Sequence, residues 1–338
     1  MSRPFAALDH PLVAAAVDGL LEVTIAPSFS RAGYLVRSRM ERWVEPPRLE
    51  GRTVVVTGSS SGIGRAAAVE LARLGAAVWI VGRDGERAAE AAAEARAASA
   101  GAAEVHTAIA DLVDPASVAG LVRAITEVSG RVDGLVHNAG ALFDTRRVAP
   151  DGTELTVATS VLAPFRLSLL LRPLLAAGGL SVIVTVSSGG MYTQGFDLDH
   201  LEMTPDEYRG AIAYARAKRA QVVLSHEWAR RWGPEGVASH AVHPGWVDTP
   251  GVEASLPHFS RLGPALRRPA EGADTIVWLV AQALASPAAF PTQGFWHDRH
   301  LRGEAYLPST RRSPEQARED GIRLWDWCAE RTDPTGGA

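Results

Sequence analysis

The 338-residue sequence contains one cysteine, Cys328, and lacks the run of about eighteen apolar residues that a membrane span requires. A single thiol can form neither an internal disulfide nor a zinc or iron–sulfur site, so Cys328 is expected to pack in the core. The apolar stretch from Leu12 to Ile25 is interrupted by Asp18 and Glu22. The N-terminus lacks the pattern of a secretory signal, and the cytoplasm is therefore the expected location.

Neither sign of charge is in large excess. Lys and Arg total 34 and Asp and Glu total 38, which leaves a formal net charge of −4. This balance argues against a nucleic-acid partner, because binding to phosphates requires excess positive charge. With 46% hydrophobic and 21% charged residues, the composition is typical of a globular protein with one large or two smaller domains.

From Arg52 onward, short β-branched runs alternate with alanine-rich segments of helical length. This alternation predicts an α/β protein with a Rossmann-type, doubly wound parallel sheet of about seven strands and helices on both faces. The expected strands are Thr53 to Thr57, Ala77 to Val81, Val105 to Ile109, Val132 to His137, Ser181 to Val186, Val237 to Val242 and Gly294 to His297. The expected helices are Ile63 to Leu74, Gly85 to Ala98, Pro115 to Val128, Thr153 to Leu175, Tyr208 to Arg231 and Glu271 to Leu284.

Two segments lie outside this alternation. We expect an N-terminal helical extension over residues 1–50, the domain of the parallel sheet over residues 51–300, and a C-terminal tail over residues 301–338. A helix is predicted in the tail, from Ser313 to Arg331. Its start is indicated by Ser313, Pro314 and Gln316, which form the Ser-Pro-x-Gln pattern typical of a helix N-terminus.

The N-terminal extension contains a basic amphipathic helix, predicted from Phe29 to Val44. One interpretation is peripheral docking on an anionic membrane surface. The favoured interpretation is a helix packed on the sheet domain with its basic side chains in water. The arginines concerned are Arg31, Arg37, Arg39 and Arg42.

The first expected strand leads directly into a glycine-rich turn and then into the first helix of the sheet domain. The turn reads Thr57-Gly58-Ser59-Ser60-Ser61-Gly62-Ile63-Gly64. Such a turn presents backbone N–H groups and the positive end of the helix dipole to a pyrophosphate, and Gly64 allows close packing of helix on strand. The sequence therefore predicts a dinucleotide site here.

The residues after the second expected strand, Gly82-Arg83-Asp84, indicate which dinucleotide is bound. A guanidinium at this place pairs with a 2′-phosphate, whereas a carboxylate binds the two ribose hydroxyls. Arg83 therefore favours NADP(H), while Asp84 leaves NAD(H) open. The alternative is that Arg83 is a solvated surface charge.

Tyr214 and Lys218 lie four residues apart in an expected helix, and therefore on one face of it. The pKa of a free tyrosine is about 10, and a nearby Lys218 cation is expected to lower it, which would make the phenol a usable acid. Ser188 and Asn138 follow the fifth and fourth expected strands. The ends of parallel strands face the same crevice as the glycine turn.

In this order the motifs resemble those of the short-chain dehydrogenase/reductase family over residues 51 to 300. The resemblance depends on Thr57 to Gly64, Asp111-Leu112, Asn138-Ala139-Gly140, Ser188, Tyr214 with Lys218, and Pro244-Gly245 followed by Thr249. An orphan subgroup is suggested by Val186 to Met191, His243 to Val252 and Gly272 to Thr275.

The resemblance implies an oxidoreductase that interconverts an alcohol and a ketone or aldehyde by hydride transfer, and a homo-oligomer. It assigns Tyr214 as general acid/base, Lys218 to the nicotinamide ribose, and Ser188 to the substrate carbonyl. The cofactor residues that it implies are Gly58, Ser60, Ser61, Gly62, Ile63, Gly64, Arg83, Asp111, Leu112, Asn138, Ala139, Gly140, Tyr214, Lys218, Pro244, Gly245, Val247 and Thr249. Of these, Asp111 would hold the adenine, and Val247 and Thr249 the nicotinamide carboxamide.

One position departs from the family pattern. Many members carry an asparagine five residues before an aromatic residue in the helix after the fourth strand, where it supports a water that relays protons; here Ser160 stands five residues before Phe165. A hydroxyl can also hold a water, so a modified relay with Ser160 is the favoured interpretation. A broken relay would favour the alternative function, a weakly active or non-catalytic NADP(H)-binding scaffold or sensor.

The segment between Ser188 and Tyr214 is longer than in compact members of the family and resembles that of lipid-carbonyl reductases. It predicts an apolar or lipid-like substrate if it forms a wall of the substrate site. The alternative is a surface loop with buried aromatic residues. No metal is expected, because His297 and His300 lack an acidic third ligand at helical spacing.

Overall fold

Eight strands form one sheet in the order β3-β2-β1-β4-β5-β6-β7-β8 in the computed structural model, which describes residues 11–249 and 260–332. Neighbouring strands are parallel from β3 to β7, and β8 runs antiparallel to β7. The strands span Thr53–Thr57 (β1), Ala77–Gly82 (β2), Val105–Ile109 (β3), Gly134–His137 (β4), Ser181–Val186 (β5), Val237–Val242 (β6), Gln293–His297 (β7) and His300–Leu301 (β8). The predicted Rossmann-type doubly wound sheet is confirmed, with β8 as an addition to the seven expected strands.

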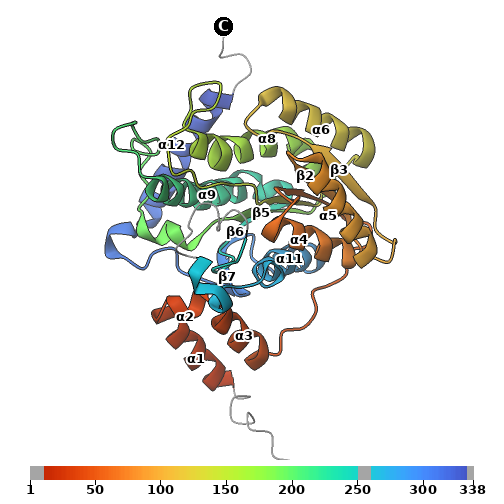
Figure 1. The fold of residues 1–338 in the computed structure, drawn as a ribbon, viewed down its shortest axis with the longest axis horizontal. Coiled ribbons are helices and arrows are strands. Elements are labelled where there is room, and N and C mark those ends of the chain that lie inside the picture. Colours follow the sequence, from red (N-terminus) through yellow and green to blue (C-terminus); the bar gives the residue numbers. More distant parts are fainter. Residues whose placement is uncertain (1–10, 250–259, 333–338) are drawn as a thin grey trace, which may run out of the picture.

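Helices cover both faces of the sheet (Figure 1). One face carries α4 (Gly62–Arg73), α5 (Gly85–Ala98) and α11 (Pro269–Ala285), and the other carries α6 (Pro115–Ser129), α8 (Ala163–Ala176) and α9 (Gly210–Trp232). Short 3₁₀ turns lie at Gly189–Thr193 (η3), Gly233–Glu235 (η4), Ser260–Ala265 (η5) and Pro308–Thr310 (η6). The strand order reverses between β1 and β4, where the carboxyl ends of parallel strands form a crevice.

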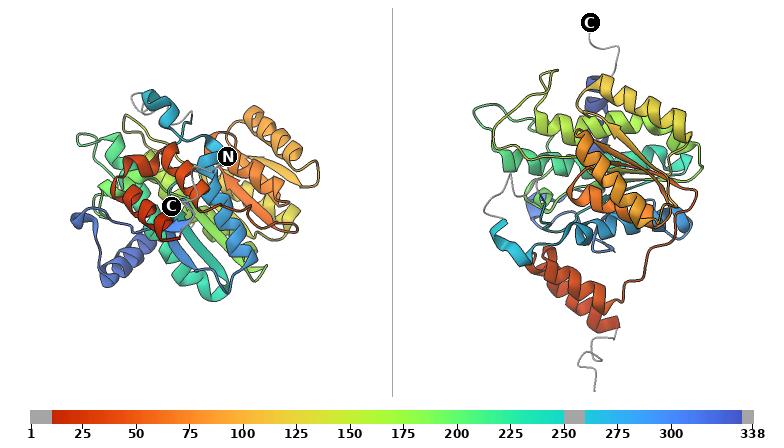
Figure 2. Two further views of the ribbon diagram at one scale, coloured as in Figure 1. Left: turned by 90° about the horizontal axis from the view of Figure 1, so that it is seen from below. Right: turned by 45° about the vertical axis from the view of Figure 1, so that its right-hand side comes forward.

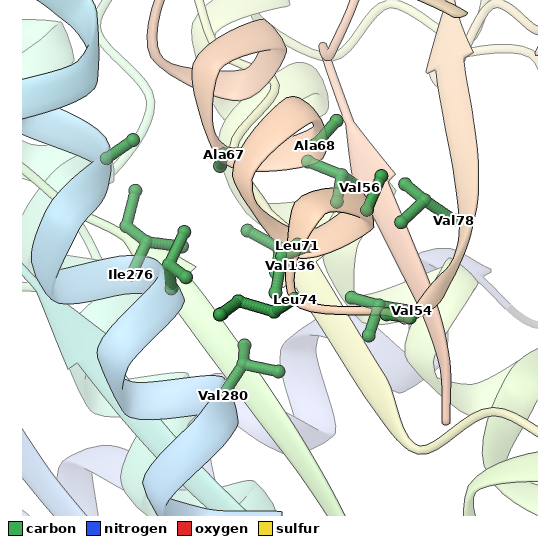
Figure 3. Close-up of a cluster of buried hydrophobic side chains, with 14 of the residues drawn as sticks. Val54, Val56, Ala67, Ala68, Leu71, Leu74, Val78, Val136, Ile276 and Val280 are labelled. Atoms are coloured by element: carbon green, nitrogen blue, oxygen red, sulfur yellow. The ribbon is translucent and has the colours of Figure 1, made fainter. Parts of the chain in front are cut away.

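The central strands are buried on both faces, which explains their continuous apolar runs. Val54 and Val56 of β1 pack with the α4 and α11 side, whereas Val55 between them packs with the α6, α8 and α9 side. Figure 3 shows the first of these clusters, to which Leu71 of α4 and Ile276 of α11 contribute beside the side chains of β1. The alternation along β1 follows from the two-residue period of a strand.

The helix expected from Thr153 to Leu175 is interrupted in the structure. It consists of α7 (Leu155–Val157), the π-helical turn η2 (Ala158–Leu162) and α8. Within the described residues, the run Leu155–Ala176 alone has the length and apolar character of a membrane span, and 67% of its most apolar window is buried inside the protein. Such burial is typical of a core helix.

The C-terminal helix α12 (Pro314–Thr332) packs against α9. Leu324 and Cys328 are fully buried, so Cys328 packs in the core as predicted. The Trp325 ring lies in edge contact with Phe165 of α8 at 4.9 Å and with Trp232 of α9 at 5.7 Å between centroids. The tail therefore adds to the core of the sheet domain.

The N-terminal extension folds into α1 (Pro11–Val23), α2 (Ala26–Phe29) and α3 (Arg31–Met40), which lie together at one side of the molecule (Figures 1 and 2). The helix expected from Phe29 to Val44 is therefore shorter, and Phe29 belongs to α2. The expectation that its arginines lie in water is wrong for Arg37, whose side chain is 1% exposed. Arg37 is buried because carboxylates from three places in the chain surround it, while Arg31 pairs with Glu271 of α11.

Candidate active site

The glycine turn after β1 packs directly against the end of β4. Gly58 and Gly62 adopt positive φ angles of 64° and 56°, and a Cβ atom on Gly58 would lie 2.9 Å from Cα of Ala139. Asn138 Nδ2 donates to the carbonyl oxygens of Thr57 at 3.0 Å and Gly58 at 3.1 Å. Thr57 Oγ1 in turn accepts from the backbone N–H groups of Asn138 and Ala139. Asn138 and Ala139 therefore hold the turn in place.

The helix that follows the turn begins without a capping side chain. Ser61 is the N-cap of α4 but makes no side-chain hydrogen bond, and the first turn contains no acidic residue. By contrast, Asp84 and Asp114 cap α5 and α6 by accepting from backbone N–H groups. The N-terminal N–H groups of α4 therefore remain available to an anion. The uncapped helix and the glycine cradle fit a dinucleotide pyrophosphate.

Arg83 and Asp84 follow β2 and have different surroundings. Asp84 accepts from the backbone N–H of Arg87 at 3.0 Å and from Arg87 Nε at 2.8 Å, and these bonds hold the pKa of its carboxyl below the ordinary value. Arg83 is exposed and has no ion-pair partner among the described residues. Ser60 approaches the end of β2, since a Cβ atom on Gly82 would lie 2.9 Å from Ser60 Oγ. Of the two charged residues, Arg83 is the one free to meet a ligand.

Asp111 and Leu112 lie beyond the end of β3. Asp111 is exposed, and its Oδ1 accepts from the backbone N–H of Val113 at 3.2 Å, while Leu112 is half-buried. The side chain of Asp111 thus stands at the same edge of the sheet as the glycine turn, two strands away from it.

The segment after β6 reaches the start of α4. A Cβ atom on Gly62 would lie 3.3 Å from Cγ2 of Thr249, and one on Gly272 would lie 2.6 Å from Val247 and 3.4 Å from Ile63. Val247 is 3% exposed. The structure therefore brings Val247 and Thr249 together with the glycine turn, although more than 180 residues separate them in the sequence.

Ser188, Tyr214 and Lys218 lie together at the carboxyl ends of β4 and β5. The Ser188 hydroxyl lies close enough to the Tyr214 phenol to affect its pKa, and Lys218 Nζ lies 5.4 Å from the centroid of the Tyr214 ring. Ser187 Oγ donates to the backbone oxygen of Lys218 at 2.9 Å, which ties the end of β5 to α9. Burial raises the pKa of Tyr214 to about 12, and the nearby Ser188 hydroxyl offsets only part of this increase.

The expected lowering of the Tyr214 pKa by Lys218 is therefore not seen in this structure. Lys218 is 3% exposed, and burial lowers its own pKa to about 7. Its Nζ donates to the backbone oxygen of Val186 at 2.8 Å and to Oε1 of Gln221 at 3.0 Å. The amine is thus directed at these two acceptors and is only partly charged at neutral pH.

Ser160 lies in the π-helical turn and is fully buried, and its Oγ has no hydrogen-bond partner among the described residues. A Cβ atom on Gly140 would lie 3.3 Å from Lys218 Nζ and 3.9 Å from Ser160 Oγ. The two polar groups therefore border the same small space beside the backbone of Gly140. An unpaired buried hydroxyl costs free energy unless a water satisfies it.

Three buried residues near the candidate site were not predicted from the sequence. Gln221 contacts Lys218, Arg267 donates to the backbone oxygen of Pro244 at 3.4 Å, and the Phe29 ring lies 4.2 Å from that of His243. Gln221 could have been found from its spacing of one helical turn from Lys218. Arg267 and Phe29 offer no local signal, because their contacts join distant parts of the chain.

The insert between Ser188 and Tyr214 packs inward. Tyr192, Phe196 and Leu201 are at most 5% exposed, and Tyr192 donates to the backbone oxygen of Gly303 at 3.0 Å. The structure favours the interpretation of a surface loop with buried aromatic residues. The helix expected from Tyr208 begins at Gly210 instead.

Residues 52–258 match the family described as short chain dehydrogenase. The chain is a short-chain dehydrogenase/reductase. Dehydrogenase/reductase SDR family member 12 of Bos taurus is 38% identical over 276 residues, which cover 81% of this chain and 85% of the relative. Retinol dehydrogenase 14 of Homo sapiens is 33% identical over 263 residues, covering 72% and 78% of the two chains.

Solved structures of short-chain dehydrogenase/reductases share this fold. The RhlG/NADP active-site complex of Pseudomonas aeruginosa superimposes with a TM-score of 0.59 at 25% identity, covering 74% of this chain and 96% of that one. The subgroup predicted from the sequence is confirmed by the similarity to family member 12. This short-chain dehydrogenase/reductase is an oxidoreductase that acts on CH–OH or C=O groups and binds a nicotinamide dinucleotide.

Proposed function

We propose that this short-chain dehydrogenase/reductase interconverts an apolar ketone or aldehyde and its alcohol with NADP(H), and that Tyr214 is the general acid/base. The observation that carries the proposal is the cluster of Ser188, Tyr214 and Lys218 at the edge of the sheet that also holds the glycine turn. A donor hydroxyl, a phenol and an amine at one place are the groups that a carbonyl reduction requires.

The chain offers a group for each part of the dinucleotide. The uncapped start of α4, with Ser60 and Ser61, would hold the pyrophosphate, and Val247 and Thr249 would hold the nicotinamide carboxamide. When bound, the nicotinamide supplies or accepts the hydride. Arg83 would hold the 2′-phosphate, because its neighbour Asp84 is already engaged as the N-cap of α5.

Proton transfer is assigned to this chain's own side chains. With a pKa of about 12, Tyr214 is protonated at neutral pH and can donate to a carbonyl oxygen that the Ser188 hydroxyl also binds. The proton lost by Tyr214 must be replaced. Lys218, whose pKa is about 7, can pass a proton on, and the unpaired Ser160 hydroxyl beside it can hold the water that connects to solvent.

The apolar character of the substrate is supported by the loop after β4 and by a relative. Leu142 and Phe143 are half-buried and lie two and three residues after Gly140. Retinol dehydrogenase 14 is named for an apolar alcohol. The buried insert between Ser188 and Tyr214 does not contribute to this argument, because its aromatic side chains face the core.

Membrane docking through the basic helix is not part of the proposal. Arg31 is paired with Glu271, and Arg37 with Asp18, Glu22 and Asp298, so two of the four arginines are already paired with carboxylates of this chain.

The alternative function, an NADP(H)-binding scaffold or sensor, is favoured by one observation. Ser160 stands where many members of the family carry an asparagine, and its hydroxyl lacks a protein partner among the described residues. A scaffold would bind the dinucleotide with the same groups but would turn over no carbonyl.

Titration with NADPH and, separately, with NADH tests the proposal. Binding is followed by quenching of the fluorescence of the nine tryptophans, and NADPH consumption is then measured with a panel of apolar aldehydes and ketones. We expect tighter binding of NADPH and turnover of at least one carbonyl. Binding without turnover would support the scaffold, and binding of neither dinucleotide would contradict both functions.

A further inference from the structure

The N-terminal extension reaches the backbone beside the candidate catalytic serine. Phe29 of α2 is 3% exposed, and its ring lies in edge contact with His243 at 4.2 Å and with Trp246 at 6.0 Å between centroids. A Cβ atom on Gly189, the residue after Ser188, would lie 2.9 Å from the Phe29 ring and 2.9 Å from His243 Nε2. Phe29 and His243 therefore fill the space behind the turn that carries Ser188.

Main-chain hydrogen bonds join the same segment to the loop after β6. The N–H of Trp246, next to Val247, donates to the backbone oxygen of Phe29 at 2.8 Å. Trp246 and Asp248 are also bonded on either side of Val247 to the backbone of Arg267, at 2.7 and 2.9 Å. The loop that would hold the nicotinamide carboxamide is thus fixed between Phe29 and Arg267.

The side chain of Arg267 binds the N-terminal segment and the loop at once. It is 1% exposed and donates to the backbone oxygens of Ser28 at 2.8 Å, Phe29 at 3.1 Å and Ser30 at 3.2 Å. It also donates to the backbone oxygen of Pro244 at 3.4 Å. Five N–H groups in a planar fork suit such a multiple contact, which a lysine could not make.

Asp298 connects Arg267 with Arg37 of α3. It accepts from Arg267 at 2.5 and 2.9 Å and from Arg37 Nη1 at 2.7 Å, and its side chain is 1% exposed. Arg37 also pairs with Asp18 at 2.6 Å and Glu22 at 2.8 Å. Buried charges are tolerated only when they are paired, so this network fixes how α1 and α3 sit on the sheet domain.

The short strand β8 has a structural role in this network. Asp298 and Arg299 form the two-residue turn between β7 and β8, and both adopt positive φ angles, of 50° and 59°. Such angles are unfavourable for an arginine and define a tight hairpin turn. Strain of this kind persists only where the surrounding contacts hold it, and the two arginines bound to Asp298 provide those contacts.

We propose that Phe29 and Arg37 of the N-terminal extension form a positioning element of the active site, in which Phe29 supports the Ser188 turn and the Arg37–Asp298–Arg267 network fixes the loop from Pro244 to Thr249. This inference depends on the proposed function for its kinetic consequences. The extension then acts on the nicotinamide end of the site, whereas Arg83 at the adenine end lies outside its reach. Loss of the element lowers the rate of the chemical step more than it weakens dinucleotide binding.

Phe29→Ala tests the element, with Phe29→Leu as the conservative variant and Val36→Ala as the matched control. Val36 lies on α3 and is 36% exposed. We expect Phe29→Ala to lower kcat at least about tenfold while the dissociation constant of NADPH changes less than about threefold, because misplacement of reacting groups acts on the transition state. Phe29→Leu should recover part of the loss, and Val36→Ala should retain wild-type values.

Arg37→Lys tests the ionic half of the element. The substitution keeps the charge but removes the fork that contacts Asp18, Glu22 and Asp298 together. We expect the same pattern as for Phe29→Ala, namely a lower kcat with nearly unchanged binding of NADPH. A variant that only melts at a lower temperature, with wild-type kcat per folded molecule, would contradict a positioning role.

Amide hydrogen exchange provides a readout that does not depend on turnover. In Phe29→Ala, peptides covering residues 187–191 and 243–248 should exchange faster than in the wild type, while those covering residues 58–64 should not change. Unchanged exchange and unchanged kcat together would overturn the inference. Absence of NADPH binding or turnover in the wild type would instead contradict the proposed function. The exchange experiment would still show whether Phe29 holds residues 187–191 and 243–248 in place.

Discussion

Lys218 Nζ donates a hydrogen bond to Oε1 of Gln221 at 3.0 Å, one turn further along α9. Both side chains are buried, and Lys218 is the only lysine in the chain, whose other long cationic side chains are all arginines. An arginine stays charged at any pH that a protein tolerates, whereas a buried lysine can lose its proton. Among the lysine and arginine side chains, Lys218 is thus the one that can exchange a proton near neutral pH.

The stability of the protein is predicted to rise between pH 7 and pH 9 because of Lys218. Its pKa is about 7 in the folded protein, against 10.5 for an unperturbed lysine, so the folded state binds fewer protons between these pH values. The free energy of unfolding then increases with pH by at most about 1.4 kcal/mol per pH unit from this group. Urea denaturation at pH 7, 8 and 9 measures the increase.

Gln221→Glu is expected to reduce this increase, because a carboxylate beside Nζ favours the charged lysine and raises its pKa. Gln221→Leu is the matched variant and should keep the pH dependence. The lysine can also be titrated directly, since the rate of its acylation, followed by mass spectrometry of its peptide, reports on a single side chain. Identical pH profiles in wild type and Gln221→Glu would show that Lys218 is charged throughout.

Tyr214→Phe is predicted to remove the proton donor while leaving the binding of NADPH nearly unchanged. Turnover should fall by about 10²- to 10⁴-fold, the usual contribution of a positioned acid, while NADPH affinity stays within about threefold of wild type. Steady-state kinetics and the fluorescence titration measure the two quantities. The Tyr214 phenol is buried beside Ser188, so the melting temperature of the variant serves as the control for folding. Wild-type turnover would exclude Tyr214 as the acid.

Substitutions of Ser160 test whether the proton relay is active or impaired. If its hydroxyl holds the relay water, Ser160→Ala should lower kcat by about tenfold and leave the NADPH affinity unchanged. Ser160→Asn, which restores the residue found in many members of the family, should change the rate less than about threefold. A large gain of rate with asparagine on any carbonyl would instead support the weakly active scaffold.

The order of the elements could be predicted because the central strands are buried on both faces and have continuous apolar runs, whereas the helices are buried on one face and have a helical period. Both patterns are visible in the sequence around β1 and α4, and the glycine turn between them marks the crevice. The clustering of Ser188, Tyr214 and Lys218 also followed, since parallel strands end at a common edge.

The N-terminal extension could not be predicted in the same way. A pattern analysis places arginines in water, as is usual, but Arg37 finds carboxylates 15, 19 and 261 residues away that make burial favourable. Contacts between residues so far apart in the chain leave no periodic pattern in the sequence, so they cannot be predicted from it. The π-helical turn at Ser160 was likewise missed, because it widens a helix without changing the apolar pattern around it.

The C-terminal helix is predicted to contribute to the stability of the sheet domain. Leu324→Ala removes a fully buried side chain from the contact of α12 with α9 and should lower the free energy of unfolding by about 2–4 kcal/mol. Leu170→Ala on α8, where the leucine is 43% exposed, is the control and should cost less than about 1 kcal/mol. Equal losses in chemical denaturation would mean that α12 does not pack as described.

Arg83→Ala is predicted to change the choice of dinucleotide. Removing the guanidinium should weaken NADPH binding by about tenfold to a hundredfold and leave NADH binding within about twofold, because only NADPH carries the 2′-phosphate. Arg87→Ala is the matched control, since Arg87 lies on α5 close to Arg83 but is already paired with Asp84. Its loss should affect neither dinucleotide strongly. If Arg83→Ala weakened both dinucleotides equally, the residue would bind a group that they share, and the preference for NADP(H) would have to come from elsewhere in the site.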